Sequence, residues 1–364
     1  MLQIVLRLAA AALLLADGGA QRVAPPSPSQ TAPASPQPLT LHVQEMQQHA
    51  TVMVPPTPAP AAAVEVAAPA ARRPAIVVLH SGFSGDESTS AAIARELTRL
   101  GFVTVMPTYR GERRALDGAR SEGSIEFCSG EVDDVQRVLA WLRSRPDVDP
   151  MRIGLFGMSH GGCVALRTAI REPRIRAVAT IAAPVAAEAV FEHLVTNPYQ
   201  FFFYNGILAQ QIRSYVDGPG RPDTPPGSFA VRSPLFLASK LTMPVMLLHG
   251  SSDHIVPPQQ ACWMAQALQR SGRSVEEKWL AKDGSQLASP QLRCRLDASP
   301  PASQSSSSAG PPRPRTELWL IQGQDHIFFS AAAKKSAQAK AMQFLQQELG
   351  AAAPASASAS TRIP

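Results

Sequence analysis

The segment RIGLFGMSHGGCVAL, residues 152–166, places a serine hydroxyl between two glycines where an apolar strand pattern meets a helical pattern. Gly157-Met158-Ser159-His160-Gly161 has the G-x-S-x-G spacing of a nucleophile elbow, a sharp turn that exposes serine at the carboxyl edge of a sheet. The helix N-terminus that follows offers N–H groups and a positive dipole potential where an oxyanion develops. Ser159 is therefore the candidate nucleophile, and the alternative is a structural turn that happens to contain serine.

A serine nucleophile needs a base, and the base needs a carboxylate that orients it. In this type of sheet the acid and then the base follow the serine, each just past a later strand. PVMLLHGSSDHIVP places Asp253 three residues after a strand-ending glycine, and ELWLIQGQDHIFF places His326 three residues after another. Asp253 and His326 are the candidate acid and base, with the neighbouring Asp325 and His254 as less favoured alternatives.

The oxyanion of an acyl intermediate needs a second N–H donor besides the backbone N–H of His160. The stretch VVLHSGFSG follows an early apolar run with a glycine-containing turn, where Gly82 or Phe83 would present its N–H. His80, at the end of that run, is interpreted as a scaffold residue, and His249 as a hydrogen-bonded core histidine. No His or Cys pair has the spacing of a zinc site, so no metal or cofactor is expected.

Alternating strand and helix patterns surround these residues and would position them. Near-continuous apolar runs, typical of strands covered on both faces, alternate with segments of helical spacing. The strand patterns are 75–80, 102–107, 152–157, 176–184, 244–250 and 317–323, and the helical patterns are 88–101, 129–145, 160–171, 258–272 and 330–350. This alternation predicts an α/β fold with a doubly wound, mostly parallel sheet. The runs 39–44 and 50–55 predict an antiparallel leading hairpin.

The composition distinguishes one folded domain from a signal peptide, a linker, an insertion and a tail. Residues 1–20 combine an arginine, a short apolar run and small residues, which predicts a signal peptide and export to the periplasm or beyond. The apolar run is too short to span a bilayer comfortably, and an uncleaved anchor is the alternative. Pro, Ser and Ala dominate residues 21–38, a linker, and 350–364, a disordered tail. Residues 282–315 are interpreted as a low-complexity insertion within a domain of 39–349.

Residues 185–240 are more than one crossover helix requires, which predicts a partial cap over the carboxyl edge of the sheet. Its aromatic cluster would line an acyl or alcohol pocket, or alternatively pack the core of the cap. The cluster consists of Tyr199, Phe201, Phe202, Phe203 and Tyr204. No acidic or basic pair in this region demands a charged substrate.

The charge balance and the cysteine content indicate which partners and which cellular compartment to expect. With 34 basic and 28 acidic residues and no block of like charges, no nucleic-acid partner is expected. Export would place the four cysteines in an oxidising compartment. Cys163 lies one helical turn after Ser159 and is expected to be packed, whereas the pairing of Cys128, Cys262 and Cys294 stays open.

Several motifs together resemble the α/β-hydrolase fold: YRG at 109–111, residues 131–162, residues 233–257 and QGQDHIFF at 322–329. Within that fold they are similar to the dienelactone hydrolase group and to the catalytic domain of the prolyl oligopeptidase group. The resemblance runs from about Ala75 to the final helix. It implies Ser159, Asp253 and His326 as nucleophile, acid and base, with His160 and the loop at Gly82 and Phe83 as oxyanion donors.

Two departures from these groups favour an esterase. Dienelactone hydrolases use a cysteine nucleophile where this chain has serine, and prolyl oligopeptidases carry a propeller for which the stretch between residue 20 and Ala75 is too short. The sequence therefore predicts a serine hydrolase that cleaves carboxylic esters or related small acyl substrates. The alternatives are a short-peptide serine peptidase and, less favoured, a non-catalytic binding protein. Natural substrate and oligomeric state stay open.

Overall fold

The computed structural model describes residues 35–43, 46–56, 71–82, 87–196, 209–214, 229–288, 294, 314–326 and 330–350. The predicted signal peptide 1–20, most of the linker 21–38 and the tail from residue 351 lie outside the described residues. So do Phe83, most of the insertion 282–315 and the aromatic cluster at 199–204. None of the helices within the described ranges is long and apolar enough to cross a membrane.

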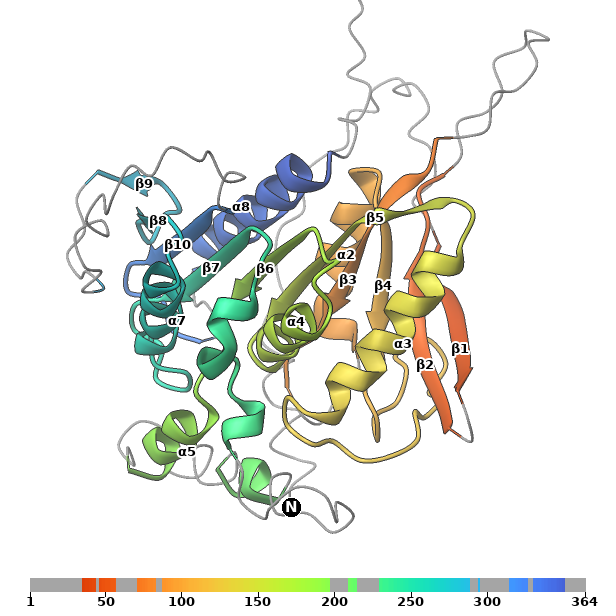
Figure 1. The fold of residues 1–364 in the computed structure, drawn as a ribbon, viewed down its shortest axis with the longest axis horizontal. Helices are drawn as coiled ribbons and strands as arrows, with labels where there is room; N and C mark the ends of the chain where they lie inside the picture. The colour runs from red at the N-terminus through yellow and green to blue at the C-terminus, as the bar shows by residue number, and fades with distance from the viewer. Residues whose placement is uncertain are drawn as a thin grey trace, which may run out of the picture. The chain divides into compact units, whose positions relative to one another are not determined.

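A mixed sheet forms the centre of the described structure, in the order β1-β2-β4-β3-β5-β6-β7-β10-β8-β9 (Figure 1). The pairs from β4 through to β8 are parallel, while β1, β2 and β9 pair antiparallel at the edges. The strands are β1 Gln37–Val43, β2 Met46–Met53, β3 Arg73–Leu79, β4 Val103–Pro107, β5 Val148–Met158, β6 Ala177–Ile181, β7 Val245–Gly250, β8 Val275–Leu280, β9 Gln286–Leu287 and β10 Thr316–Ile321.

Helices cover both faces of this sheet (Figure 1). They are α2 Ala91–Arg99, α3 Gly130–Ser144, α4 His160–Arg171, α5 Ala187–Thr196, α7 Gln259–Arg270 and α8 Ala331–Leu349, with 3-10 helices η1 Glu87–Ser90, η2 Ala230–Arg232 and η3 Pro234–Lys240. Successive residues of β3 show the two layers, because side chains alternate along a strand. Val77 and Leu79 belong to the apolar cluster that includes buried residues of α3, α4 and α7, whereas Ile76 and Val78 belong to the one that includes those of α2 and α8. The predicted α/β-hydrolase architecture is confirmed.

The structure departs from the sequence reading at three places. β1 begins at Gln37, inside the range predicted as linker, and β5 begins at Val148 rather than at Arg152. β8 has no counterpart among the predicted strands, because its VEEKWL pattern contains three charged residues. β8 pairs with β9, so the segment predicted as an insertion from residue 282 begins within the turn of a β-hairpin and includes its second strand. A disulfide from Cys294 to Cys262 of α7 ties this segment further to the domain.

Candidate active site

Ser159 lies between the last residue of β5 and the first residue of α4. Its φ of 52° is in the left-handed region, which a residue other than glycine adopts only when its surroundings impose it. The Ser159 N–H donates to the Ile181 carbonyl at 2.8 Å, and the Ser159 carbonyl accepts from the Gly162 N–H at 2.8 Å. The chain therefore enters α4 through a strained turn that leaves the serine partly exposed.

Both glycines of the G-x-S-x-G motif are required by close backbone contacts. A Cβ atom on Gly157 would lie 2.2 Å from the carbonyl oxygen of Gly161, and one on Gly161 would lie 2.2 Å from that of Leu79. Real Cβ atoms do not approach so closely, and backbone atoms cannot swing aside as a side chain would. The two glycines thus let β3, β5 and α4 meet at the serine.

Three side chains from distant loops meet in series at this turn. Ser159 Oγ lies 2.8 Å from His326 Nε2, and His326 Nδ1 lies 2.8 Å from Asp253 Oδ2. Asp253 follows β7 and His326 follows β10, two strands that pair in parallel and end at the same edge of the sheet. The rival residues lie elsewhere: His326 pairs with Asp253 rather than with its neighbour Asp325, and His254 is exposed.

The Asp253 carboxylate is buried and fully engaged. Its Oδ1 accepts the N–H groups of Ile255 and Val256 at 3.0 and 2.8 Å, and His249 Nε2 lies 3.2 Å from its Oδ2. Burial alone would raise the pKa of Asp253, but the charge and hydrogen bonds of His326 and His249 hold that pKa well below its usual range. The lowered pKa favours the ionised carboxylate, which accepts a hydrogen bond from the Nδ1–H of His326.

His249 has a role that the sequence did not indicate. The prediction of a buried, hydrogen-bonded core histidine holds, since its Nε2 donates to the Val256 carbonyl at 2.7 Å. The same nitrogen also faces Asp253, so His249 braces the loop that carries the carboxylate. A strand-ending histidine four residues before the acid was the only sequence signal for this contact.

The backbone groups predicted to bind an oxyanion lie at the N-terminus of α4 and in the loop after β3. The N–H of His160 follows the nucleophile directly, and Gly82, with a φ of 91°, lies in the loop after β3. The His160 imidazole meets the Tyr109 ring edge-on, with centroids 5.4 Å apart, and so contacts a side chain that packs against the end of β3. Burial lowers the pKa of His160 to about 3, which keeps this ring neutral.

His80 supports the same loop from beneath, as the scaffold interpretation requires. It is fully buried, its Nε2 lies 3.0 Å from Glu112 Oε2, and its ring stacks on Tyr109 with centroids 4.1 Å apart. The Tyr109 hydroxyl donates to the His80 carbonyl at 3.4 Å. These contacts fix the end of β3 immediately before Gly82. The partner carboxylate was not identified from the sequence.

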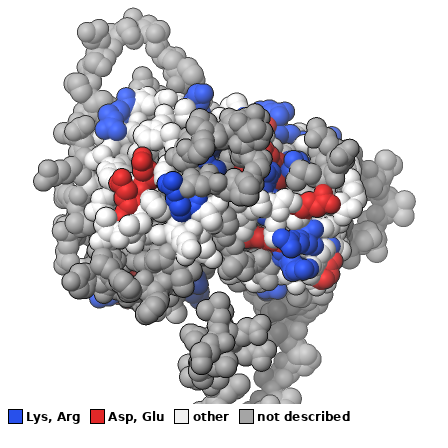
Figure 2. Space-filling model, turned by 90° about the horizontal axis from the view of Figure 1, so that it is seen from below, with Lys and Arg blue, Asp and Glu red and all other residues white. Residues whose placement is uncertain are grey.

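The structure describes part of the predicted cap over the carboxyl edge of the sheet. α5, residues 209–214, η2 and η3 belong to the predicted cap range 185–240, whereas its aromatic cluster lies outside the described residues. On the face seen in Figure 2, described Lys and Arg side chains are interspersed with Asp and Glu. Within the described part of the chain, no group of three or more His, Cys, Asp or Glu side chains could hold a metal ion.

Comparisons with known proteins agree on the fold and the broad class. Residues 88–296, more than half of the chain, match the prolyl oligopeptidase family. The uncharacterized peptidase YtmA of Bacillus subtilis is 26% identical over 176 residues, which cover 48% of this chain and 62% of that protein. This chain thus spans less than two thirds of that relative's length.

Solved structures extend the likeness over most of the chain. A puromycin-hydrolyzing peptidase of Mycobacterium tuberculosis superposes with a TM-score of 0.60 at 20% identity, covering 89% of this chain and 41% of that one. An esterase of Pyrococcus furiosus superposes with a TM-score of 0.56 at 13% identity, covering 92% of this chain and 100% of that one. At these identities the superpositions establish the fold, and they include both a peptidase and an esterase.

Proposed function

This chain belongs to the prolyl oligopeptidase family of serine hydrolases, and we propose that it cleaves carboxylic esters or related acyl compounds through an acyl-enzyme. The observation that carries the proposal is the unbroken series from Ser159 Oγ to His326 and from His326 to Asp253, with 2.8 Å at each step. Such a series is what converts a weakly nucleophilic hydroxyl into an attacking oxygen.

In the acylation step His326 Nε2 takes the proton of Ser159 Oγ as this oxygen attacks the substrate carbonyl carbon. The negative charge that forms on the carbonyl oxygen is stabilised by the His160 N–H and by an N–H of the loop at Gly82 or Phe83. His326 then gives its proton to the leaving alkoxide oxygen, the carbon–oxygen bond breaks, and the acyl group stays on Ser159.

In the deacylation step a water molecule takes the place of the alcohol. His326 removes a proton from this water, the resulting oxygen attacks the acyl carbon, and the proton returns to Ser159 Oγ. Asp253 holds the imidazole in the tautomer with the proton on Nδ1 and stabilises the imidazolium that forms twice in the cycle. Its lowered pKa suits that role, because a carboxylate that stays ionised neither loses its hydrogen bond nor takes the proton itself.

Ester cleavage is the main proposal because an alkoxide leaves with less help from a general acid than an amine does. The site then needs only the base, the nucleophile and the backbone donors already described. Peptide or amide cleavage is a second candidate, supported by the family match and by relatives named as peptidases. It would use the same residues, with His326 protonating the departing amine.

Short p-nitrophenyl esters and aminoacyl-p-nitroanilides, tested on the wild type beside Ser159→Ala, separate the candidates. Ester turnover that is lost in the variant supports the main proposal. Anilide cleavage with a comparable kcat/KM would transfer the assignment to a peptidase. A folded wild-type protein that turns over neither substrate would contradict a catalytic function and favour a binding protein.

Export is proposed as well. It is supported by the signal-like residues 1–20 and by two disulfides, which persist in oxidising compartments. Fractionation of cells that express the full chain should recover the protein outside the cytoplasm, shortened at its N-terminus when examined by mass spectrometry. Full-length protein confined to the cytoplasm would contradict export.

A further inference from the structure

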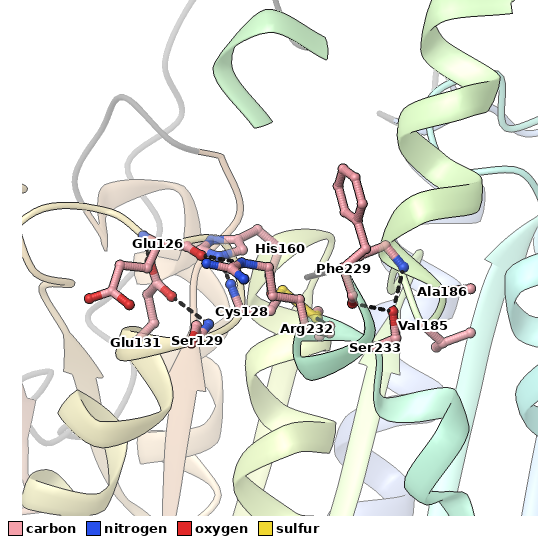
Figure 3. The surroundings of a disulfide bond; sticks show 12 residues. Glu126, Cys128, Ser129, Glu131, His160, Val185, Ala186, Phe229, Arg232 and Ser233 are labelled. Atoms are coloured by element: carbon pink, nitrogen blue, oxygen red, sulfur yellow. Dashed lines mark hydrogen bonds between the residues drawn. A yellow bond between two sulfur atoms is a disulfide. The ribbon is translucent and has the colours of Figure 1, made fainter. Parts of the chain in front are cut away.

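A disulfide joins Cys128 to Cys163, one helical turn after the candidate nucleophile Ser159; its surroundings are drawn in Figure 3. It joins the segment before α3 to the first turn of α4, with Cα atoms 5.9 Å apart and both cysteines buried. The Cys163 N–H donates to the Ser159 carbonyl at 3.3 Å. The covalent bond is therefore anchored on the same helical turn that carries the serine.

On its other side the disulfide holds loop 126–129, whose backbone is strained. Phe127 and Cys128 have φ of 52° and 59°, in the left-handed region that L-residues avoid, and both are buried. The buried Glu131 carboxylate accepts the N–H groups of Glu126 and Ser129 at 2.6 and 3.0 Å. Burial raises the pKa of Glu131. Such a loop keeps its conformation only while it is anchored at several points.

Loop 126–129 contacts the oxyanion side of the site through the His160 side chain. The Cys128 N–H donates to His160 Nε2 at 3.2 Å (Figure 3). The Phe127 ring stacks on the imidazole with centroids 5.7 Å apart. Because Nε2 accepts, the neutral ring carries its proton on Nδ1. The ring also meets the Tyr109 ring edge-on, with centroids 5.4 Å apart, and Tyr109 contacts His80, the residue that follows β3 and precedes the loop at Gly82. The imidazole therefore connects the disulfide-bonded loop with both segments that supply the oxyanion donors.

We propose that the Cys128–Cys163 disulfide is a positioning element of the active site. By fixing loop 126–129 on α4 it holds the His160 imidazole, and through it the spacing between the His160 N–H and the loop at Gly82. This inference rests on the proposed function, since it concerns the oxyanion hole of the same site. Small displacements of such donors lower kcat, because their interactions are strongest in the transition state.

The second disulfide provides a matched control. Cys262–Cys294 spans 32 residues and Cys128–Cys163 spans 35, so removal of either relaxes the unfolded chain to a similar extent. Cys262–Cys294, however, joins α7 to the segment after the edge strand β9, and the contacts of the described residues do not connect it with His160. We therefore expect that removal of Cys262–Cys294 lowers stability but does not change the position of the oxyanion donors.

The test compares Cys128→Ser/Cys163→Ser with Cys262→Ser/Cys294→Ser and the wild type, each first shown to be folded by circular dichroism. We expect the first variant to lose at least about tenfold in kcat with KM changed less than about threefold, as loss of transition-state interactions requires. The control variant should keep kcat within about twofold. A folded Cys128→Ser/Cys163→Ser protein with wild-type kcat would overturn the inference, and so would an equal loss in the control.

His160→Phe tests the same route with both disulfides intact. Phenylalanine keeps a ring against Phe127 but removes the acceptor of the Cys128 N–H, so kcat should again fall about tenfold or more. When His160→Phe is combined with Cys128→Ser/Cys163→Ser, the loss in kcat should be no greater than the larger of the two separate losses, because both changes break the same connection. Wild-type kcat in folded His160→Phe, or losses that multiply, would overturn the inference. If the wild type turns over no substrate, the proposed function fails instead.

Discussion

Replacing Asp253 by asparagine should nearly abolish activity, because the hydrogen bonds around this side chain dictate how asparagine must sit. Oδ1 accepts two backbone N–H groups, from Ile255 and Val256, so the carbonyl oxygen of the asparagine takes that position. The NH2 group then replaces Oδ2 and points at His326 Nδ1, at a position where the wild-type distance is 2.8 Å. The alternative orientation would set the NH2 group against two backbone donors.

A donor facing Nδ1 reverses the tautomer of His326. The imidazole must then carry its proton on Nε2, the nitrogen 2.8 Å from Ser159 Oγ, and it can no longer accept the serine proton. The same substitution in a Ser-His-Asp site of this kind costs about four orders of magnitude in kcat. At about 1.4 kcal/mol per tenfold this is roughly 5 to 6 kcal/mol of transition-state stabilisation.

Steady-state kinetics with a p-nitrophenyl ester measure this loss, with Asp325→Asn as the matched control. Asp325 adjoins His326 in the chain, but His326 Nδ1 pairs with Asp253, so the control should keep kcat/KM within about threefold. Circular dichroism must show that both variants are folded. Folded Asp253→Asn with more than one tenth of wild-type kcat/KM, or a larger loss in Asp325→Asn, would refute the reasoning.

Three further predictions concern stability. Gly161→Ala places a Cβ 2.2 Å from the Leu79 carbonyl and should lower the free energy of unfolding by about 3 kcal/mol or more in urea denaturation; a change below about 1 kcal/mol would contradict this contact. The pKa of His160 is about 3 in the folded protein and about 6.5 in the unfolded chain, so the free energy of unfolding is highest above about pH 6.5 and falls as the pH is lowered. His160→Phe should reduce this pH dependence by up to about 1.4 kcal/mol per pH unit. The same pH dependence in wild type and variant would contradict this prediction. Removing Cys262–Cys294 should cost about 3 to 4 kcal/mol, measured by the same unfolding experiment, and unchanged stability would count against that bond.

The parts of the fold and site that the sequence predicted depend on local patterns. Apolar runs identified the central strands, and the glycines that end them placed Ser159, Asp253 and His326 in loops at one edge of a parallel sheet. The order of the three residues along the chain then followed from the elbow motif. The structure brings them together because β5, β7 and β10 share a direction, which short-range periodicity can indicate.

The features that the sequence missed depend on contacts between distant segments. β8 was missed because three of its six residues are charged, although Lys278 pairs with Glu276 and Glu317 and lies over the Trp319 ring. The Cys128–Cys163 pairing could not be predicted because it depends on where loop 126–129 lies in the fold. Two residues with left-handed backbone conformation bend this loop towards α4. Glu131 had only the signature of an acid in the first turn of a helix, yet its carboxylate binds the backbone of that loop.

Covalent labelling of the serine tests the central claim most directly. A fluorophosphonate, which phosphonylates an activated serine hydroxyl, is incubated with the wild type and with Ser159→Ala, and intact-mass spectrometry is followed by peptide mapping. The account predicts one adduct per wild-type chain, on the peptide that contains Ser159, and none on the variant. A folded, substrate-hydrolysing wild type that stays unlabelled, or an adduct on another residue that persists in Ser159→Ala, would contradict it.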